Sequence, residues 1–373
     1  MNSTSLVAAE SVIGAIESAV DEMEAGGRMP SALASSIADA GLFRMLVPKS
    51  LGGGEVHPLE LVDVVERIAR VNASAAWCVM IAATTGVMAG WMPRDRAAEV
   101  FGDRSGVWGG AYAPLGCAVV DGDDFVLDGR WPWGSGSQNC TWFAGGATCD
   151  DGVFRLCYVP ASEVTIHENW DVVGLRGTGS HDWSVVAARV PRDRTVALLG
   201  GVPVDEGTLY RFPVFGLLAL GISAVALGIG AAAIDELIGL AGAKTPSLQR
   251  RRLADRGTVQ AEVARMTAEL RGARAYLVDA VNAAWASIAD GGDPDVATRA
   301  ELRLAATHAA HTVTRVVDSA FTLAGGTSVR TSSPLARHLR DCHVVTQHLM
   351  VSPVTYETVG RVLLGLPNEA MDL

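Results

Sequence analysis

The sequence has few basic residues for its length. Its 373 residues include 30 lysines and arginines against 41 aspartates and glutamates, a formal net charge of -11 at pH 7. Binding to nucleic acid or to an anionic lipid surface depends on clustered Lys and Arg side chains. The composition therefore argues against nucleic-acid and membrane partners. The one basic run, Arg250 to Arg252, is either a solvated helix end or a local phosphate site.

Cysteine is also sparse, and no pair has CxxC spacing. The six cysteines are too few and too scattered for a disulfide-rich scaffold or a zinc ribbon, which fits a reducing compartment. The N-terminal segment contains Glu10 and Glu17 and has no basic region before an apolar stretch, so we expect no secretory signal. These features predict a cytoplasmic protein.

Motifs for nicotinamide cofactors and for metals are missing. Residues 228–233 formally match GxGxxA, but they lie inside an apolar stretch with no preceding strand, and Arg250 stands where an acidic residue is needed. No HExxH pattern accompanies the scattered histidines, so we expect no metal site. The histidines considered are His308, His311, His338 and His343.

One segment without charge, residues 214–234, is long enough to span a bilayer. Its many Gly and Ala residues make it only moderately apolar, and we identify it as the sole segment of this kind. A helix buried in a bundle or in a subunit interface is therefore favoured over a membrane span.

The pattern along the chain changes twice. Residues 1–105 are predicted to be helical, with an amphipathic helix from Leu6 to Met23 and another from Pro58 to Val71. Residues 106–205 contain short alternating apolar runs separated by Gly, Asp and Pro, which predict strands. Residues 206–373 return to helical spacing.

The longest helices are predicted over residues 258–289 and 298–323, which together imply a helical bundle. The order of helices, strands and helices predicts an α+β protein with segregated layers rather than an alternating βαβ sheet. We therefore expect three domains with the boundaries 1–105, 106–205 and 206–373.

The most informative local stretch is Gly129-Arg130-Trp131-Pro132-Trp133-Gly134-Ser135-Gly136-Ser137. It places two indoles beside hydroxyls on a backbone that glycine leaves open, which suits a flat ring with polar edges. The alternative is a β-turn with both tryptophans in the core. The local sequence leaves both interpretations open.

Four segments read together resemble a known family. They are residues 41–48 with the glycines at 52–54, residues 129–137, the run Gly174 to Ser180, and residues 324–326 with Arg340-Asp341. In this order they resemble the acyl-CoA dehydrogenase fold, and more narrowly its flavin-dependent monooxygenases, including two-component aromatic hydroxylases. The resemblance implies an N-terminal helical domain, a central β-barrel domain and a C-terminal four-helix bundle.

The resemblance also implies roles for individual residues. Trp133 would lie against the isoalloxazine ring and the hydroxyl of Ser135 near flavin N5. Thr178 and Ser180 would help form the flavin and substrate cleft, although from the residues alone this segment is equally a turn between strands. In the family's assembly, usually a homotetramer, a neighbouring subunit can help bind the phosphate end of the flavin. The candidates there are Arg251, Arg252, Gly325 and Gly326.

The catalytic base of the dehydrogenases is missing. In many of them an Arg-Asp pair is followed by a Tyr-Glu-Gly-Thr segment whose Glu removes the substrate proton, whereas this sequence has no carboxylate over residues 345–350. Glu357 lies too far along the chain for this role. His348 matches a histidine of the monooxygenase relatives that orients or deprotonates a substrate, and an unperturbed imidazole titrates near neutral pH. Considered alone, His348 is more typical of a structural hydrogen bond.

Several relatives have a second histidine in the helix that corresponds to residues 77–91. This sequence has Thr84 and Thr85 there and no histidine, so a second catalytic imidazole is not expected at that place. Tyr112 and His181 are the alternatives for another base, and the residues do not decide between them.

The resemblance implies a reduced-flavin-dependent monooxygenase that uses FADH2 or FMNH2 and dioxygen, forms a C4a-hydroperoxide, and hydroxylates an aromatic or heteroaromatic, phenol- or indole-like small molecule. Because the sequence has no pyridine-nucleotide motif, a separate flavin reductase would supply the reduced flavin. The alternatives are an N- or S-oxygenase of the same fold and an acyl-CoA dehydrogenase. An interaction protein without flavin is the remaining, non-enzymatic alternative.

Overall fold

The computed structural model describes residues 3–289 and 291–367, which form two compact units. Unit 1 contains the chain up to Val64, Trp77–Val172 and Arg176–Arg211. Unit 2 contains Val65–Ala76, Val173–Leu175 and the chain from Phe212 onward. Most of the N-terminal helical block thus shares unit 1 with the strands, and the helical bundle, with Val65–Ala76 of that block, forms most of unit 2. The domain boundaries expected at residues 105 and 205 stay a prediction.

The N-terminal block is helical, as the spacing of apolar residues predicts. Its helices are α1 (Thr4–Gly26), α2 (Ser31–Asp39), α3 (Pro58–Ala69), α4 (Ala73–Gly86) and α5 (Arg94–Phe101). In α1, Ser3 caps the first turn by accepting a hydrogen bond from Leu6 N, and Gly27 ends the helix in the left-handed conformation at φ +64°. The amphipathic helix expected from Leu6 to Met23 is therefore confirmed, with two further residues at its start and three at its end.

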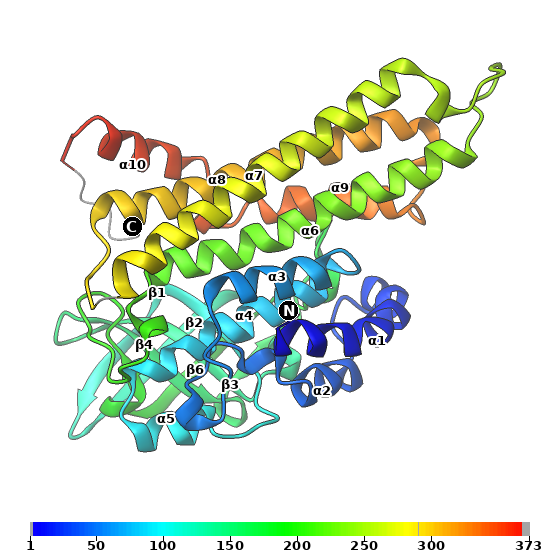
Figure 1. Ribbon diagram of the computed structural model, residues 1–373. Coiled ribbons are helices and arrows are strands. Elements are labelled where there is room, and N and C mark those ends of the chain that lie inside the picture. Colours follow the sequence, from blue (N-terminus) through cyan, green and yellow to red (C-terminus); the bar gives the residue numbers. More distant parts are fainter. Residues whose placement is uncertain (1–2, 290, 368–373) are drawn as a thin grey trace. The chain divides into compact units, whose positions relative to one another are not determined.

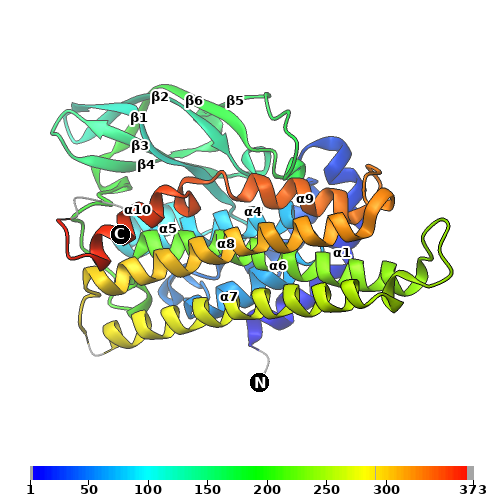
Figure 2. The same cartoon turned by 90° about the horizontal axis from the view of Figure 1, so that it is seen from above.

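The strands of unit 1 form one mixed sheet (Figure 2). They are β1 (Trp108–Asp121), β2 (Asp124–Gly134), β3 (Trp142–Cys149), β4 (Phe154–Pro160), β5 (Thr165–His167), β6 (His181–Pro191) and β7 (Thr195–Val196). Their order is β5-β6-β2-β1-β3-β4-β7, and β1 pairs with β3 in parallel while the other pairs are antiparallel.

The central β domain is confirmed, and where the resemblance implies a β-barrel the structure has one mixed sheet. Among the described residues the ladder ends at β5 and β7 and does not close. These edge strands have three and two residues. Strands this short offer too few backbone groups to pair with each other and complete a barrel.

Trp131 lies in a slot that three strands make for it. A Cβ atom on Gly116, Gly129 or Gly145 would lie 2.5, 2.4 or 2.8 Å from the indole of Trp131, so these positions accept only glycine without rearrangement. The indole nitrogen donates to Gly146 O over 2.9 Å. Gly116, Gly129 and Gly145 are therefore explained by the packing of one buried tryptophan.

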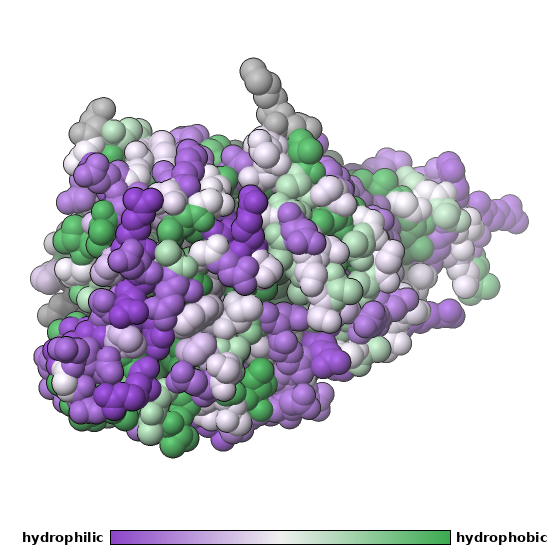
Figure 3. Space-filling model, turned by 90° about the horizontal axis from the view of Figure 1, so that it is seen from below, coloured by the Kyte–Doolittle hydropathy of each residue, from purple (hydrophilic) through white to green (hydrophobic). Residues whose placement is uncertain are grey.

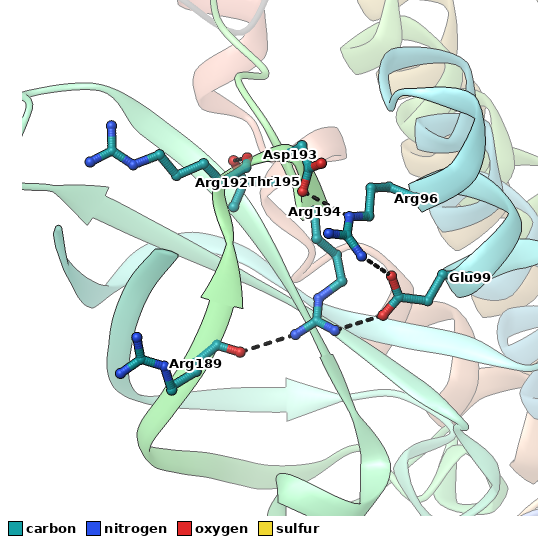
Figure 4. Close-up of polar contacts among 7 residues, drawn as sticks. All are labelled: Arg96, Glu99, Arg189, Arg192, Asp193, Arg194 and Thr195. Atoms are coloured by element: carbon teal, nitrogen blue, oxygen red, sulfur yellow. Dashed lines mark hydrogen bonds and ion pairs between the residues drawn. The ribbon is translucent and has the colours of Figure 1, made fainter. Parts of the chain in front are cut away.

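An ion-pair network joins α5 to the sheet within unit 1 (Figure 4). The buried guanidinium of Arg194 donates to Glu99 Oε1 over 2.9 Å and to Arg189 O over 3.1 Å. Arg96 donates to Glu99 Oε2 and to Asp193 Oδ1, each over 2.8 Å. Because Arg194 is buried and held on both sides, the network fixes the place of α5 against the end of β6.

Unit 2 is a helical bundle (Figure 1). Its helices are α6 (Val214–Ala243), α7 (Gly257–Ala289), α8 (Val296–Ala324), α9 (Pro334–Val345) and α10 (Val354–Leu363). Helix α8 packs against α6, α7, α9 and α10. The predicted four-helix bundle is confirmed in α6 to α9, and α10 lies against α8 as an additional helix.

The GxGxxA match lies in the middle of α6 and serves packing. A Cβ on Gly228 would lie 2.5 Å from Ala69 Cβ, and one on Gly230 would lie 3.1 Å from Leu270. Glycine at these positions lets helices approach closely. The match is therefore a packing feature of a bundle helix, which agrees with the rejection of a dinucleotide site.

Within the part of the chain that the structure describes, two helical segments are long and apolar enough to cross a membrane, Ala73–Trp91 and Val214–Ala243, and 94% of each apolar window is buried inside the protein. The expectation that residues 214–234 form a buried helix is confirmed. The expectation that this segment is the sole one of its kind is wrong, because Ala73–Trp91 passes the same test. On the face seen in Figure 3, hydrophilic and hydrophobic residues are interspersed.

Candidate functional site

Trp131 and Trp133 occupy opposite environments although they are two residues apart. Trp131 is fully buried and stacks on Trp183 with ring centroids 4.3 Å apart, whereas the side chain of Trp133 is 70% exposed. The pairing of β2 with β6 shifts register between Trp131 and Gly134, so an irregularity in the ladder separates the two indoles. One tryptophan is therefore a core residue, and the other offers its face outward.

The backbone of Trp133 is in a conformation that a bulky side chain rarely adopts. Its φ is +63°, which costs on the order of 1–3 kcal/mol for such a residue. The next residue accepts only glycine without rearrangement, since a Cβ on Gly134 would lie 2.7 Å from the ring of Trp183. A strained backbone that exposes an indole is the kind of outlier that marks binding sites.

Ser135, Thr178 and Ser180 lie together in unit 1. Ser180 Oγ is 2.8 Å from Ser135 Oγ and 2.8 Å from Thr178 Oγ1, and all three side chains are buried. Ser135 follows β2, while the other two precede β6. The structure contains the turn between strands, since Thr178 ends the short 3-10 helix Arg176–Thr178, and the role of these residues in a flavin cleft stays a prediction.

Trp77 of α4 completes this group and was not expected from the sequence. Its indole nitrogen donates to Ser135 Oγ over 3.0 Å. The two residues are 58 positions apart, and no motif around Trp77 points to the contact. Only the packing of α4 against the end of β2 brings them together.

Two further contacts fix the segments that hold these hydroxyls. Gly136 N donates to Thr178 O over 2.8 Å, and Ser137 Oγ donates to Gly179 O over 2.9 Å. The backbone after β2 is therefore tied directly to the backbone before β6. Gly136 itself has φ +71°, which lets the chain turn at this point.

His181 has a structural role. Its Nδ1 accepts hydrogen bonds from Asn169 N and from Trp170 N, each over 3.0 Å. Burial lowers the pKa of His181. The ring therefore holds the loop after β5 and is not placed as the second base.

Burial raises the pKa of the Tyr112 hydroxyl well above its ordinary value. The phenol thus keeps its proton near neutral pH and is not available as a base. Neither Tyr112 nor His181 supports a second catalytic base.

The GLRGTGS run contacts the Arg-Asp pair inside unit 2. Asp341 is buried, and its Oδ1 accepts a hydrogen bond from Leu175 N over 2.7 Å. A Cβ on Gly174 would lie 2.5 Å from Arg340 O. The two motifs are therefore linked by close backbone packing, which explains the glycine and the aspartate.

His348 stands between α9 and the 3-10 helix η11 (Leu349–Val351), where its Nδ1 accepts a hydrogen bond from Met350 N over 3.2 Å. Burial and the charge of Arg303 lower the pKa of His348 to about 4. The imidazole is thus neutral at physiological pH, and because Nδ1 accepts, the proton resides on Nε2. Such a ring donates a hydrogen bond and is a weak base, so orienting a substrate fits better than deprotonating it.

Arg303 of α8 supports the turn that contains His348. Its buried guanidinium donates to Met350 O over 3.2 Å and to Thr355 Oγ1 over 3.4 Å. Glu357, the other candidate for a base, is exposed on α10. The structure therefore does not support Glu357 in the role of the dehydrogenase carboxylate.

The four residues expected at the phosphate end of a flavin lie at one end of the bundle. Lys244, at the end of α6, donates to Ala324 O over 2.6 Å and to Thr327 Oγ1 over 2.8 Å, across the turn that contains Gly325 and Gly326. Leu253 packs in a small core with Ala241 and Val259, which brings the segment with Arg251 and Arg252 to the same end.

These four residues are exposed, as a binding role requires. Arg252 forms an ion pair with Asp255 over 3.3 Å. Gly325 has φ +60°, and no atom lies within 4 Å of a Cβ placed on Gly326. Lys244 is a cation at this end that the sequence did not single out.

The helical histidines have separate partners. His311 Nε2 contacts Val351 O over 3.0 Å, and His308 Nε2 contacts Thr312 Oγ1 over 3.4 Å. Within residues 3–289 and 291–367, no group of three or more His, Cys, Asp or Glu side chains is placed to hold a metal ion.

Two family models match this sequence. The model described as "Acyl-CoA dehydrogenase, N-terminal domain" matches residues 7–92, and that described as "Acyl-CoA dehydrogenase, C-terminal domain" matches residues 220–353. These matches cover the helical block with α4 and most of the bundle.

Known proteins resemble the chain over nearly its whole length. The indole-3-acetate monooxygenase of Pseudomonas putida is 36% identical over 331 residues, which cover 87% of this chain and 84% of the relative. The flavin-dependent monooxygenase, oxygenase subunit HsaA, of Mycobacterium tuberculosis is 27% identical over 380 residues and 96% of each chain.

Among solved structures, XiaF from Streptomyces sp., in complex with FADH2 and glycerol, is similar with a TM-score of 0.90, at 25% identity and over 98% of each chain. The fold, the two matched domain models and the 36% identity to the indole-3-acetate monooxygenase point to the same family. The chain belongs to the flavin-dependent monooxygenases of the acyl-CoA dehydrogenase fold.

Proposed function

We propose that this protein is the oxygenase component of a two-component system that hydroxylates an aromatic or heteroaromatic, phenol- or indole-like small molecule. The observation that carries the proposal is the pairing of an exposed, strained indole at Trp133 with the buried hydroxyl of Ser135 two residues later. An indole-like substrate is favoured by the 36% identity to an indole-3-acetate monooxygenase.

The residues at the end of β2 fit a flavin. Trp133 presents a flat apolar face, and Ser135 presents a hydroxyl fixed by Trp77 and Ser180. A stacking face beside a single oriented hydrogen-bonding group suits a ring whose edge carries one reactive nitrogen. When bound, the reduced flavin supplies the electrons and activates dioxygen.

The protein's own residues would bind, orient and shield. Trp133 would stack on the ring and limit access of water to it, which favours oxygen transfer over loss of hydrogen peroxide. Ser135 would form a hydrogen bond at N5. The neutral imidazole of His348 would contact the substrate and so help to hold the acceptor in place.

The end of the bundle would bind the flavin phosphates. Arg251 and Arg252 supply guanidinium groups, and the turn at Gly325 and Gly326 leaves backbone accessible. We propose that a neighbouring subunit shares this site in a homotetramer. A separate flavin reductase would deliver the reduced flavin in the cytoplasm, and the relative HsaA is itself named an oxygenase subunit.

The test is a reconstituted reaction under 18O2. The protein is mixed with NADH, FAD or FMN, a flavin reductase, and indole-3-acetate or a simple phenol as the probe. We expect one 18O atom in the organic product, only when the reductase is present. Rapid NADH oxidation by this chain alone, or product oxygen derived from water, would contradict the proposal.

A further inference from the structure

The hydrogen-bonding capacity of Ser135 is almost filled inside the protein. A serine hydroxyl has one proton to donate and two lone pairs. The indole nitrogen of Trp77 only donates, so its 3.0 Å contact occupies one lone pair of Ser135 Oγ. The 2.8 Å contact with Ser180 Oγ uses a second position, and either oxygen can be its donor. One position of Ser135 remains, and Ser180 decides whether it is a donor or an acceptor.

Ser180 can be oriented in two ways, because its Oγ lies 2.8 Å from both Ser135 Oγ and Thr178 Oγ1. In the first, Ser135 donates to Ser180, Ser180 donates to Thr178, and Ser135 keeps a lone pair that accepts. In the second, Thr178 donates to Ser180, Ser180 donates to Ser135, and Ser135 keeps its proton to donate. The three hydroxyls can thus invert the polarity of Ser135 together while every oxygen atom stays in place.

The surroundings favour such an array. All three hydroxyl side chains are buried, so bulk water competes little for their protons. The contacts of Gly136 N with Thr178 O and of Ser137 Oγ with Gly179 O hold the two segments at a fixed separation. Trp77 fixes the position of Ser135 Oγ without taking part in the inversion.

The two polarities match the two redox states of a flavin. N5 of the reduced ring carries a hydrogen and donates, whereas N5 of the oxidised ring has a lone pair and accepts. On the basis of the proposed function, in which Ser135 faces N5, we propose that Ser180 and Thr178 are positioning residues that set the polarity of Ser135 to match the redox state of the bound flavin. Trp77 is the third positioning residue, because it fixes the oxygen that both states use.

The sharpest variant is Thr178→Val, which keeps the shape and removes the acceptor for the proton of Ser180. Ser180 then donates to Ser135, and Ser135 presents its proton outward, which suits oxidised flavin. We expect the affinity for reduced flavin to fall about tenfold relative to that for oxidised flavin. For a two-electron couple, this equals a midpoint potential lower by about 30 mV. Ser180→Ala should shift the ratio of the dissociation constants for reduced and oxidised flavin in the same direction.

Matched variants separate this effect from general damage. Thr178→Ser keeps the hydroxyl and should restore the ratio of the wild-type protein. Ser223→Ala removes a fully buried hydroxyl of α6 that donates to Leu220 O over 2.9 Å and has no part in the array, so it should leave the ratio unchanged. Trp77→Phe should weaken the binding of both redox states alike. Far-UV circular dichroism confirms that each variant is folded.

The measurement is the anaerobic titration of each protein with oxidised and with dithionite-reduced FAD and FMN. A change in the ratio of the two dissociation constants for Thr178→Val, absent in Thr178→Ser, supports the inference. Equal weakening of both states in Thr178→Val, or no change, overturns the inference and leaves the proposed function standing. Failure of the wild-type protein to bind either state overturns the proposed function itself.

Discussion

The indole nitrogen of Trp77 donates a hydrogen bond to Ser135 Oγ over 3.0 Å. This contact joins α4 to the end of β2 and fixes the hydroxyl of Ser135, two residues after the exposed indole of Trp133. The strained backbone of Trp133 is thus followed, two residues later, by a side chain that Trp77 holds in place. A binding surface of this kind needs its side chains to be held by other groups before the ligand arrives.

Replacing Trp133 by glycine should have opposite effects on stability and on binding. Glycine adopts φ +63° without steric cost, so we expect Trp133→Gly to keep or raise the free energy of unfolding, by up to about 1 kcal/mol. The affinity for flavin should fall at least about tenfold, because the stacking face is lost. Urea unfolding without ligand measures the first quantity. A clear loss of stability would show that the exposed indole supports the fold.

The close packing of Gly174 should make any side chain there costly. A Cβ would lie 2.5 Å from Arg340 O, which is backbone and cannot move aside freely. We expect Gly174→Ala to lower the free energy of unfolding by about 1–3 kcal/mol. Gly239→Ala in α6 is the matched control, since nothing lies within 4 Å of its Cβ and alanine favours a helix. Equal effects of the two variants would argue against the contact.

The Arg194 network should contribute to the stability of unit 1. Replacing Arg194 by methionine keeps much of the volume but removes the hydrogen bonds to Glu99 and Arg189, so we expect a loss of about 2 kcal/mol. The exposed pair of Arg130 with Asp182 should matter less, and Arg130→Met should cost under about 1 kcal/mol. Chemical denaturation of both variants checks the difference, and a smaller loss in Arg194→Met than in Arg130→Met would contradict it.

Acid should destabilise the protein through its buried histidines. Burial and the charge of Arg303 lower the pKa of His348 to about 4, and burial and the charge of Arg337 lower the pKa of His338 to about 3. In the unfolded chain both groups take up a proton near pH 6.5, so between pH 6.5 and about 4 the unfolded state binds more protons. Stability should therefore fall as the pH falls through this window, with a slope of up to about 1.4 kcal/mol per pH unit for each histidine.

Urea unfolding of the wild-type protein between pH 7 and pH 4 tests this dependence. His348→Gln and His338→Gln should each have a shallower slope than the wild-type protein. An unchanged slope in both variants would contradict the assignment. Because His348 stays neutral, its titration should not shape the pH profile of product formation between pH 5 and pH 8.

The order of elements could be predicted from the sequence because periodicity is local. The spacing of apolar residues from Leu6 to Met23 and over residues 258–289 indicated helices that the structure contains. The environment of the tryptophans could not be predicted. Whether Trp133 faces outward depends on the register between β2 and β6, which pairs residues about fifty positions apart.

The parts of the candidate site that escaped prediction depend on contacts distant in sequence. Neither Trp77 nor Lys244 belongs to a motif. The packing of α4 brings Trp77 to Ser135. The packing of α6 brings Lys244 to the turn after α8. The proton position on His348 follows from one backbone contact with Met350 N. The sequence predicted an imidazole at this place, and the ordinary pKa of histidine suggested a base. In the structure the pKa of His348 is lowered to about 4, which favours a neutral ring that donates a hydrogen bond.

The most direct measurement is an anaerobic titration of the wild-type protein and of Trp133→Gly with reduced FAD and reduced FMN. The account predicts saturable binding of at least one reduced flavin to the wild-type protein and affinity at least about tenfold weaker in the variant. Equal affinities in the two proteins, or no binding of either flavin to the wild-type protein, would contradict it.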